Sequence, residues 1–313
     1  MQSFSANLYI ISSALKHHAY IGTLPTPDKL LTAMYFSDDE REMFKGTNLY
    51  PAISDRQTQW TSEWKQCRDA ISQVNADWGR AYSWESFLAF ATYVSSRAFP
   101  SSLLSSSPTL ISGPSTEPVL IPGLDALNHR RAQPVSWVYS PDPQPAMSIV
   151  IRAPTDAGEE LFNNYGPKPN VELILGYGFS FPHNPDDTIL LQIGGQPANR
   201  KWDIGRDAVG MDPLWDELVG LVVETPTSRP TYEDILEASA VLREMTEKMI
   251  DRLPVEVPSS GIRDSVREMW THYTEGTFDL DRYLGSLLYR STSHPYIYRR
   301  ICRQKEGGCN RNG

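Results

Sequence analysis

The spacing of apolar residues changes twice along the chain, and this constrains the fold more than any other feature of the sequence. Through residues 1–99 the apolar positions recur at helical spacing. Residues 100–119 are dominated by Ser, Pro, Thr and Gly, a composition typical of a flexible surface loop. Short β-prone runs follow in 120–199, and helical spacing returns in 200–313. The sequence therefore predicts an α+β chain with short irregular sheets followed by an all-helical C-terminal domain.

Local signals predict where individual elements begin and end. Ser37 and Glu40 form a capping-box pattern, in which each side chain bonds the other residue's main-chain N–H. Ser83 is a predicted N-cap of a helix that runs to about Arg97. Further helices are expected at Leu8–Leu15, near Arg56–Asn75, and at Leu214–Val223, Tyr232–Leu253, Ser265–His272 and Leu280–Leu288. Strands are expected at Val135–Tyr139, Met147–Ile151 and Thr188–Ile193.

Composition excludes several classes of protein. The net charge of −9 and the pI near 5.2 argue against broad nucleic-acid binding, which needs a basic surface. An acidic surface suits basic partners such as lysine-rich protein tails, although it is also common among soluble proteins. The sequence contains no nucleophile elbow, P-loop or metal-ligand cluster, so hydrolase and phosphotransferase activities find no support.

The three cysteines, Cys67, Cys302 and Cys309, have no spacing that could close a zinc site, and they suggest a reducing compartment. The N-terminal apolar run Leu8–Ile11 is much shorter than the roughly 20 residues of a membrane helix. We therefore expect no metal and no membrane association, and a location in the cytoplasm, with the nucleus as a second possible site.

Three clusters of residues could carry chemistry. The first is Val94–Phe99 with Arg97, which by itself is an ordinary helix C-terminus. The second is Leu120–His129, where Asp125, Asn128 and His129 could equally form a capped turn. The third is Gly158–Gly166 with Tyr165, followed by Asn170 and by Gly176–Phe179 with Tyr177; separately, these tyrosines are more often structural than catalytic. Their order and spacing together favour a functional interpretation.

In that order, the clusters resemble SET-domain protein methyltransferases of the Rubisco large-subunit methyltransferase branch, which includes fungal ribosomal-protein lysine methyltransferases and the actin histidine methyltransferase. Segments Tyr35–Asp38, Lys45–Leu49 and Trp60–Trp64 also resemble the helical insert of this branch. The resemblance covers roughly residues 8 to 195. It implies a partial SET domain over 1–199, with a helical insert in 1–99, the loop 100–119 and the catalytic core motifs in 120–199. It also implies a helical substrate-binding-like domain over 200–313.

The resemblance implies methyl transfer from S-adenosyl-L-methionine (SAM) to a protein side-chain nitrogen, with lysine as the default acceptor and histidine as the alternative. Arg97 would pair with the SAM carboxylate, and Asp125, Asn128 and His129 would complete the cofactor site. Tyr177 matches the catalytic tyrosine, while Tyr165 would line the lysine channel and the cofactor site. The partner would be a protein substrate, such as a ribosomal protein or a translation factor.

One part of the pattern is not found. Members of this branch begin with strands that carry a Gly-x-Gly segment close to SAM, whereas the one Gly-x-Gly here is Gly176–Gly178, within the tyrosine motif. A shortened chain, a catalytically inactive descendant and an enzyme with another way to bind SAM would each explain this. The alternative function is therefore an inactive, SET-derived protein-binding module.

Overall fold

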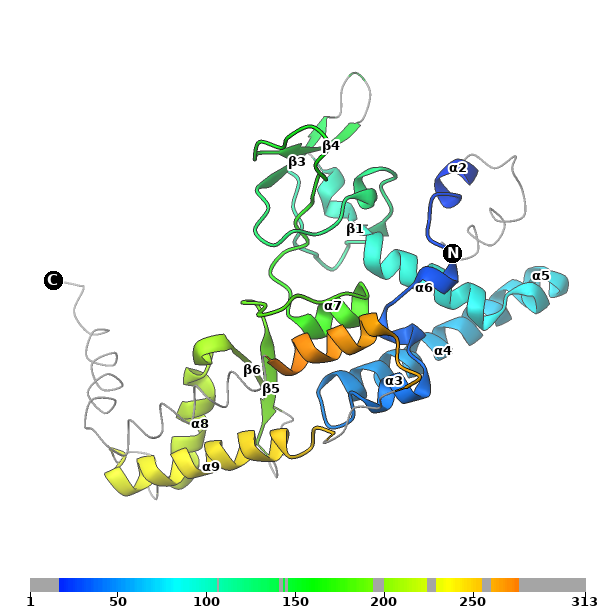
Figure 1. The fold of residues 1–313 in the computed structure, drawn as a ribbon. Helices are drawn as coiled ribbons and strands as arrows, with labels where there is room; N and C mark the ends of the chain where they lie inside the picture. Colours follow the sequence, from blue (N-terminus) through cyan, green and yellow to red (C-terminus); the bar gives the residue numbers. More distant parts are fainter. Residues whose placement is uncertain are drawn as a thin grey trace. The chain divides into compact units, whose positions relative to one another are not determined.

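The computed structural model describes residues 17–105, 107–140, 143, 146–193, 200–223, 229–254 and 260–275. The chain divides into two compact units, coloured along the sequence in Figure 1. The first unit comprises the described residues within 1–36, 52–168 and 172–179. The second comprises those within 37–51, 169–171 and 180–313. The predicted boundary at residue 199 remains a prediction.

Helices α4 and α6, joined through the short helix α5, supply most of the core of the first unit. Helix α4 spans Leu49–Val74, α5 spans Ala76–Ala81 and α6 spans Trp84–Arg97. The predicted cap at Ser83 is confirmed, because its hydroxyl accepts the Ser86 main-chain N–H at 3.2 Å. The buried side chains of this core are Met34, Trp60, Ile71, Tyr82, Phe87 and Leu88.

Helix α4 begins earlier than the predicted start near Arg56. It starts at Leu49 and contains Pro51 in its first turn. A proline is tolerated there because the first main-chain N–H groups of a helix have no partner within the helix. Pro51 therefore marks the beginning of the helix rather than a break before it.

Short antiparallel ladders complete the first unit. Strand β1 (Phe99–Pro100) pairs with β2 (Pro118–Val119), so the two ends of the predicted loop lie together. Strand β3 (Val135–Ser140) pairs with β4 (Ala146–Ile151) in the register Val135↔Ile151 to Ser140↔Ala146, which confirms both predicted strands. Two short helices also contribute, α2 (His18–Ile21) and most of α7 (Asn170–Gly176).

The second unit packs a two-stranded sheet against two helices. Strand β5 (Thr188–Gln192) pairs antiparallel with β6 (Lys201–Gly205), and α8 (Asp212–Val222) and α9 (Tyr232–Ile250) cover it. Their shared core consists of Ile189, Leu191, Trp202, Ile204, Leu214, Leu218, Ala238 and Leu242.

The prediction that residues 200–313 are all-helical is wrong at β6, because residues 201–205 form a strand. It buries only Trp202 and Ile204 and leaves Lys201 and Asp203 exposed, so its apolar alternation covers just two positions. That is too short to distinguish from the helical spacing that follows it. The α+β class is nevertheless confirmed by the mixture of helices with short antiparallel strands.

A buried ion pair holds helix α3 (Asp38–Glu42) in the second unit. The predicted capping box is confirmed: Ser37 Oγ accepts the Glu40 N–H at 3.2 Å, and Glu40 Oε2 accepts the Ser37 N–H at 2.9 Å. Arg263 adds bonds from Nε and Nη2 to the same carboxylate, at 2.8 and 2.7 Å. Arg263 directly precedes a helix over 264–275, where the helix Ser265–His272 was predicted.

Two predicted helices, Leu8–Leu15 and Leu280–Leu288, lie outside the described residues. Within the described ranges, no helix combines the length and the apolar character that crossing a membrane requires.

Candidate active site

The second and third sequence clusters lie side by side in the first unit. His129 and Asn163 form a parallel β-bridge. The Asn163 N–H donates to the Asn128 carbonyl oxygen at 2.8 Å, and the Arg130 N–H donates to the Asn163 carbonyl oxygen at 2.9 Å. Asn163 is buried, with 2% of its surface exposed. The bridge therefore brings together motif segments that are more than 30 residues apart in the sequence.

Three aromatic side chains stack next to this bridge. The His129 and Tyr165 rings are 5.0 Å apart and nearly parallel, and Tyr165 and Tyr177 repeat that spacing. His129 Nδ1 accepts the Tyr165 main-chain N–H at 3.0 Å. A neutral imidazole that accepts at Nδ1 carries its proton on Nε2. The stack therefore has a fixed ring orientation at its His129 end.

The hydroxyl groups of the two stacked tyrosines are in different situations. The Tyr165 hydroxyl donates to the Leu127 carbonyl oxygen at 2.8 Å, and burial raises its pKa to about 12. For the Tyr177 hydroxyl we find no hydrogen-bond partner among the described residues, and burial raises its pKa as well. Both groups are therefore neutral phenols near pH 7. Only the Tyr177 hydroxyl is available to an incoming group.

The turn after α7 places Tyr177. The Tyr177 and Gly178 N–H groups both donate to the Leu173 carbonyl oxygen at 2.9 Å. Gly178 has φ +82°, and a Cβ atom there would lie 2.5 Å from the Leu31 carbonyl carbon. Glycine is required at this position because the conformation and the close approach both exclude a side chain. The Gly-Tyr-Gly pattern thus positions the tyrosine through its second glycine.

A lysine side chain lies beside the Tyr177 ring. Lys168 Nζ is 5.7 Å from the centre of that ring and 3.0 Å from Glu172 Oε2. Burial alone would lower the pKa of Lys168, but the hydrogen bond to Glu172 raises it. Lys168 is therefore a cation, and its charge opposes the effect of burial on the Tyr177 pKa.

Arg97 and Asp125 lie together at the C-terminal end of α6. Arg97 Nη1 donates to the Asp125 carbonyl oxygen at 2.9 Å and lies 3.7 Å from Asp125 Oδ2. The Asp125 side chain is 2% exposed, whereas the Arg97 side chain is 28% exposed. Both charges act electrostatically on the Tyr165 hydroxyl. The charged pair and the aromatic stack therefore belong to one site.

The structure assembles the predicted site residues with one qualification. Arg97, Asp125, His129, Tyr165 and Tyr177 lie in one cluster. Asn128 contributes its main-chain oxygen to the bridge, but its side chain is exposed and its amide donates to Glu160 Oε1 at 2.6 Å. The cofactor and catalytic roles of these residues remain predictions.

Sequence reasoning missed two contributors to this site. Tyr20 donates its hydroxyl to Asp125 Oδ2 at 2.6 Å across 105 residues, and no local pattern marks it. Asn163 lies within the third cluster, and its burial could only be recognised once the bridge was known.

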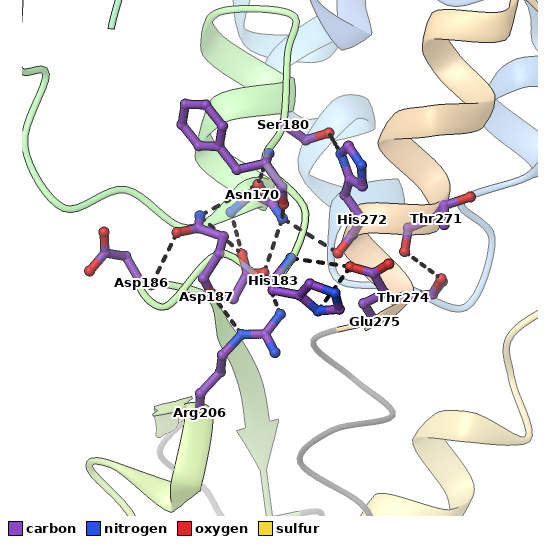
Figure 2. A network of polar contacts seen from close by, with 12 residues as sticks. Asn170, Ser180, His183, Asp186, Asp187, Arg206, Thr271, His272, Thr274 and Glu275 are labelled. Carbon is purple, nitrogen blue, oxygen red and sulfur yellow. Dashed lines mark hydrogen bonds and ion pairs between the residues drawn. The ribbon is translucent and has the colours of Figure 1, made fainter. Parts of the chain in front are cut away.

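A separate polar network lies in the second unit (Figure 2). The Asp187 carboxylate accepts the Asn170 main-chain N–H at 2.6 Å and the Asn170 amide at 3.0 Å, and it lies 3.5 Å from the Arg206 guanidinium. The Asn170 amide also contacts the His272 carbonyl oxygen. Burial raises the pKa of Asp187 to about 6. These bonds connect the first residue of α7, the residue before β5, the residue after β6 and the 264–275 helix, so we interpret the network as structural.

In the described ranges, no group of three or more His, Cys, Asp or Glu side chains is arranged so that it could hold a metal ion.

The chain has relatives among lysine methyltransferases. Ribosomal lysine N-methyltransferase set10 of Schizosaccharomyces pombe is 31% identical over 229 residues, which are 72% of this chain and 40% of that protein. Ribosomal lysine N-methyltransferase 1 of Saccharomyces cerevisiae is 34% identical over 113 residues, 36% of this chain and 18% of that protein. Human N-lysine methyltransferase SETD6 is 37% identical over 78 residues, 24% of this chain and 16% of that protein. The chain thus spans less than half the length of these relatives. No protein-family model matches it.

Solved structures of Rubisco LSMT have the same fold as this chain. Rubisco LSMT bound to sinefungin and monomethyllysine matches with a TM-score of 0.68 and 18% identity, over 97% of this chain and 78% of that one. Rubisco LSMT bound to AdoMet matches with a TM-score of 0.66 and 17% identity, over 99% and 81%. The fold is therefore that of the LSMT SET domain, and the chain belongs with the SET-domain methyltransferases of the Rubisco large-subunit and ribosomal-protein lysine methyltransferase branch.

Proposed function

We propose that this chain carries the catalytic site of a SAM-dependent protein-lysine N-methyltransferase. The observation that carries the proposal is the half-buried Tyr177 phenol, stacked on Tyr165 and without a hydrogen-bond partner among the described residues. A hydroxyl held in this way can orient an amine that enters along the aromatic faces. The names of the relatives, which are lysine methyltransferases, support the same reaction.

The residues present suit the charged end of SAM. A guanidinium has five N–H donors in a planar fork that matches a carboxylate, and Arg97 directs one of its nitrogens, Nη1, to the Asp125 carbonyl oxygen. Its partial exposure leaves room for a ligand carboxylate. When bound, SAM would supply an electrophilic methyl group on a sulfonium centre. Arg97 would hold the cofactor by its carboxylate.

The acceptor amine would depend on the aromatic stack. The faces of Tyr165 and Tyr177 attract a cationic or partly cationic amine, which helps lysine to enter. Exclusion of water by the half-buried rings would lower the pKa of that amine, so it can lose its proton and become nucleophilic. The Tyr177 hydroxyl then fixes the direction of its lone pair. This arrangement serves orientation more than proton transfer.

We further propose that the substrate is a basic protein of the translation machinery and that the methyl transfer takes place in the cytoplasm. Two relatives are named as ribosomal lysine methyltransferases, and a net charge of −9 favours a lysine-rich partner. Lysine is the proposed acceptor, and histidine is the outcome that product analysis would distinguish.

The test is transfer of a radiolabelled methyl group from SAM to ribosomal proteins. Tyr177→Phe should abolish transfer and leave the unfolding temperature unchanged, since it removes only a hydroxyl without a partner. Tyr232→Phe, at a tyrosine 53% exposed on α9, is the matched control and should retain full transfer. Unchanged transfer by Tyr177→Phe would refute the assigned role.

SAM binding by calorimetry separates the enzyme from an inactive module. Wild-type chain should bind SAM, and Arg97→Ala should weaken that binding at least tenfold, because a charge-assisted bond to a carboxylate is lost. A wild-type chain that captures basic proteins but does not bind SAM would favour the inactive protein-binding module instead.

A further inference from the structure

The Asp125 carboxylate is satisfied by two neutral donors. Its Oδ1 accepts the Gly123 main-chain N–H at 3.1 Å, and its Oδ2 accepts the Tyr20 hydroxyl at 2.6 Å. The nearest cation, Arg97, stays 3.7 Å from Oδ2 and donates to the Asp125 main-chain oxygen instead. The buried carboxylate therefore does not form a direct hydrogen bond with the guanidinium.

This arrangement keeps Arg97 available to an anionic ligand. A buried carboxylate that lost a donor would need a replacement, because an unsatisfied buried charge is costly. Arg97 is the cation beside this carboxylate, and a shift of about 1 Å would bring its Nη1 from 3.7 Å to hydrogen-bonding distance of Asp125 Oδ2. Such a pair would occupy the fork that a ligand carboxylate needs.

We propose that Tyr20 is a positioning residue for SAM, because its hydroxyl holds the Asp125 carboxylate away from the Arg97 guanidinium. The inference rests on the proposed SAM-binding function and extends it to a residue that does not touch the cofactor carboxylate itself. It explains why an acidic side chain can lie beside a binding site for an anion. Asp125 orients Arg97 through its main-chain oxygen, and Tyr20 prevents its side chain from competing with the ligand.

The charge state of Tyr20 suits this role. Burial raises the pKa of the Tyr20 hydroxyl above its ordinary value, the hydrogen bond to Asp125 raises it further, and Arg97 opposes the rise. The phenol is therefore neutral and donates its proton throughout the physiological range. The backbone near it is also fixed, since the Tyr20 carbonyl oxygen accepts from the Thr23 hydroxyl at 2.6 Å.

The experiment compares two ligands by calorimetry. SAM carries the carboxylate that Arg97 would bind, whereas 5′-methylthioadenosine has the adenosine and the sulfur but no carboxylate. Tyr20→Phe should weaken SAM binding roughly tenfold, the effect of losing one charge-assisted contact, and should leave 5′-methylthioadenosine binding unchanged. Tyr93→Phe is the matched control: it also removes a hydroxyl bond, to the Pro25 carbonyl oxygen, but not one to Asp125. It should change neither affinity.

A double variant tests the mechanism. In Asp125→Asn there is no side-chain charge to capture Arg97, so adding Tyr20→Phe should cause no further loss of SAM affinity. A further tenfold loss in the double variant would overturn the proposal, as would equal weakening of both ligands by Tyr20→Phe. Wild-type chain that binds neither ligand would refute the proposed function together with this inference. Wild-type binding with an unaffected Tyr20→Phe variant would refute only the inference.

Discussion

Replacing Arg263 by Ala should destabilise the second unit far more than an ordinary surface substitution. Arg263 donates from its main-chain N–H, Nε and Nη2 to the Glu40 carboxylate, whose side chain is 2% exposed. The alanine variant keeps the main-chain bond and the Ser37 N–H but removes the positive charge. Breaking a buried pair from one side costs about 3–5 kcal/mol. The Arg263 side chain is 39% exposed, so water can reach the gap, and we expect a loss of about 3 kcal/mol.

The measurement is thermal unfolding followed by circular dichroism. A loss of this size should lower the transition temperature of the second unit by roughly 6–12 °C. The matched control is Arg243→Ala, which breaks another Arg–Glu contact, at 2.8 Å with Glu247, where both side chains are more than half exposed. Exposed pairs of this spacing contribute about 0.5 kcal/mol or less. Equal shifts for the two variants would show that burial of Glu40 does not set the energetic value of the pair.

The same pair should give a pH signature. Burial alone would raise the pKa of Glu40, but the hydrogen bonds from Arg263 and Ser37 lower it below its ordinary value of 4.5. A group with a lowered pKa stabilises the fold above its unfolded pKa and loses that contribution as the pH falls through the folded value. The difference between wild type and Arg263→Ala should therefore be full at pH 7 and shrink below about pH 4.5. A difference that is independent of pH would contradict this account.

Three further outcomes follow from local geometry. Burial raises the Asp187 pKa from 3.8 to about 6, so Asp187 stabilises the fold when it is protonated and loses that contribution as the pH rises through 6. In urea titrations, the unfolding free energy of the wild type should therefore fall by up to about 3 kcal/mol relative to that of Asp187→Asn. Gly178→Ala should lower the unfolding free energy by roughly 2–4 kcal/mol, because the positive φ strains an alanine and its Cβ atom would clash with the Leu31 backbone. Gly158→Ala is the control: it has a φ of +93° but open space around the Cβ position, so it should cost only about 1 kcal/mol in the same assay. Ser83→Ala should cost about 1 kcal/mol in thermal unfolding through loss of the α6 cap.

Local chemistry made part of this fold predictable. The capping box at Ser37 and Glu40, the cap at Ser83 and the β3–β4 pair all depend on residues close in sequence, and the structure confirms them. The bond between Arg263 and Glu40 joins residues 223 positions apart, so no local pattern could reveal it. Strand β6 escaped prediction because a five-residue alternation carries little periodic information.

The candidate site shows the same division. The order of the motifs was enough to select Arg97, Asp125, His129, Tyr165 and Tyr177, and the structure brings them together. The order of the motifs could not show which tyrosine hydroxyl has a hydrogen-bond partner, because the acceptor of the Tyr165 hydroxyl is a main-chain carbonyl oxygen. Nor could it reveal Tyr20, whose contact exists only once residues 105 positions apart meet.

The β1–β2 ladder suggests where the chain would accept foreign sequence. Phe99 and Pro100 pair with Val119 and Pro118, and the Ser101 N–H donates to the Glu117 carbonyl oxygen at 2.8 Å, so the base of the intervening segment is closed by its own bonds. Lengthening a segment whose ends are already joined costs only about 0.6 kcal/mol per doubling of its length. A short tag inserted after Gly113, which is exposed, would therefore provide a handle for immobilising or labelling the protein without displacing Arg97.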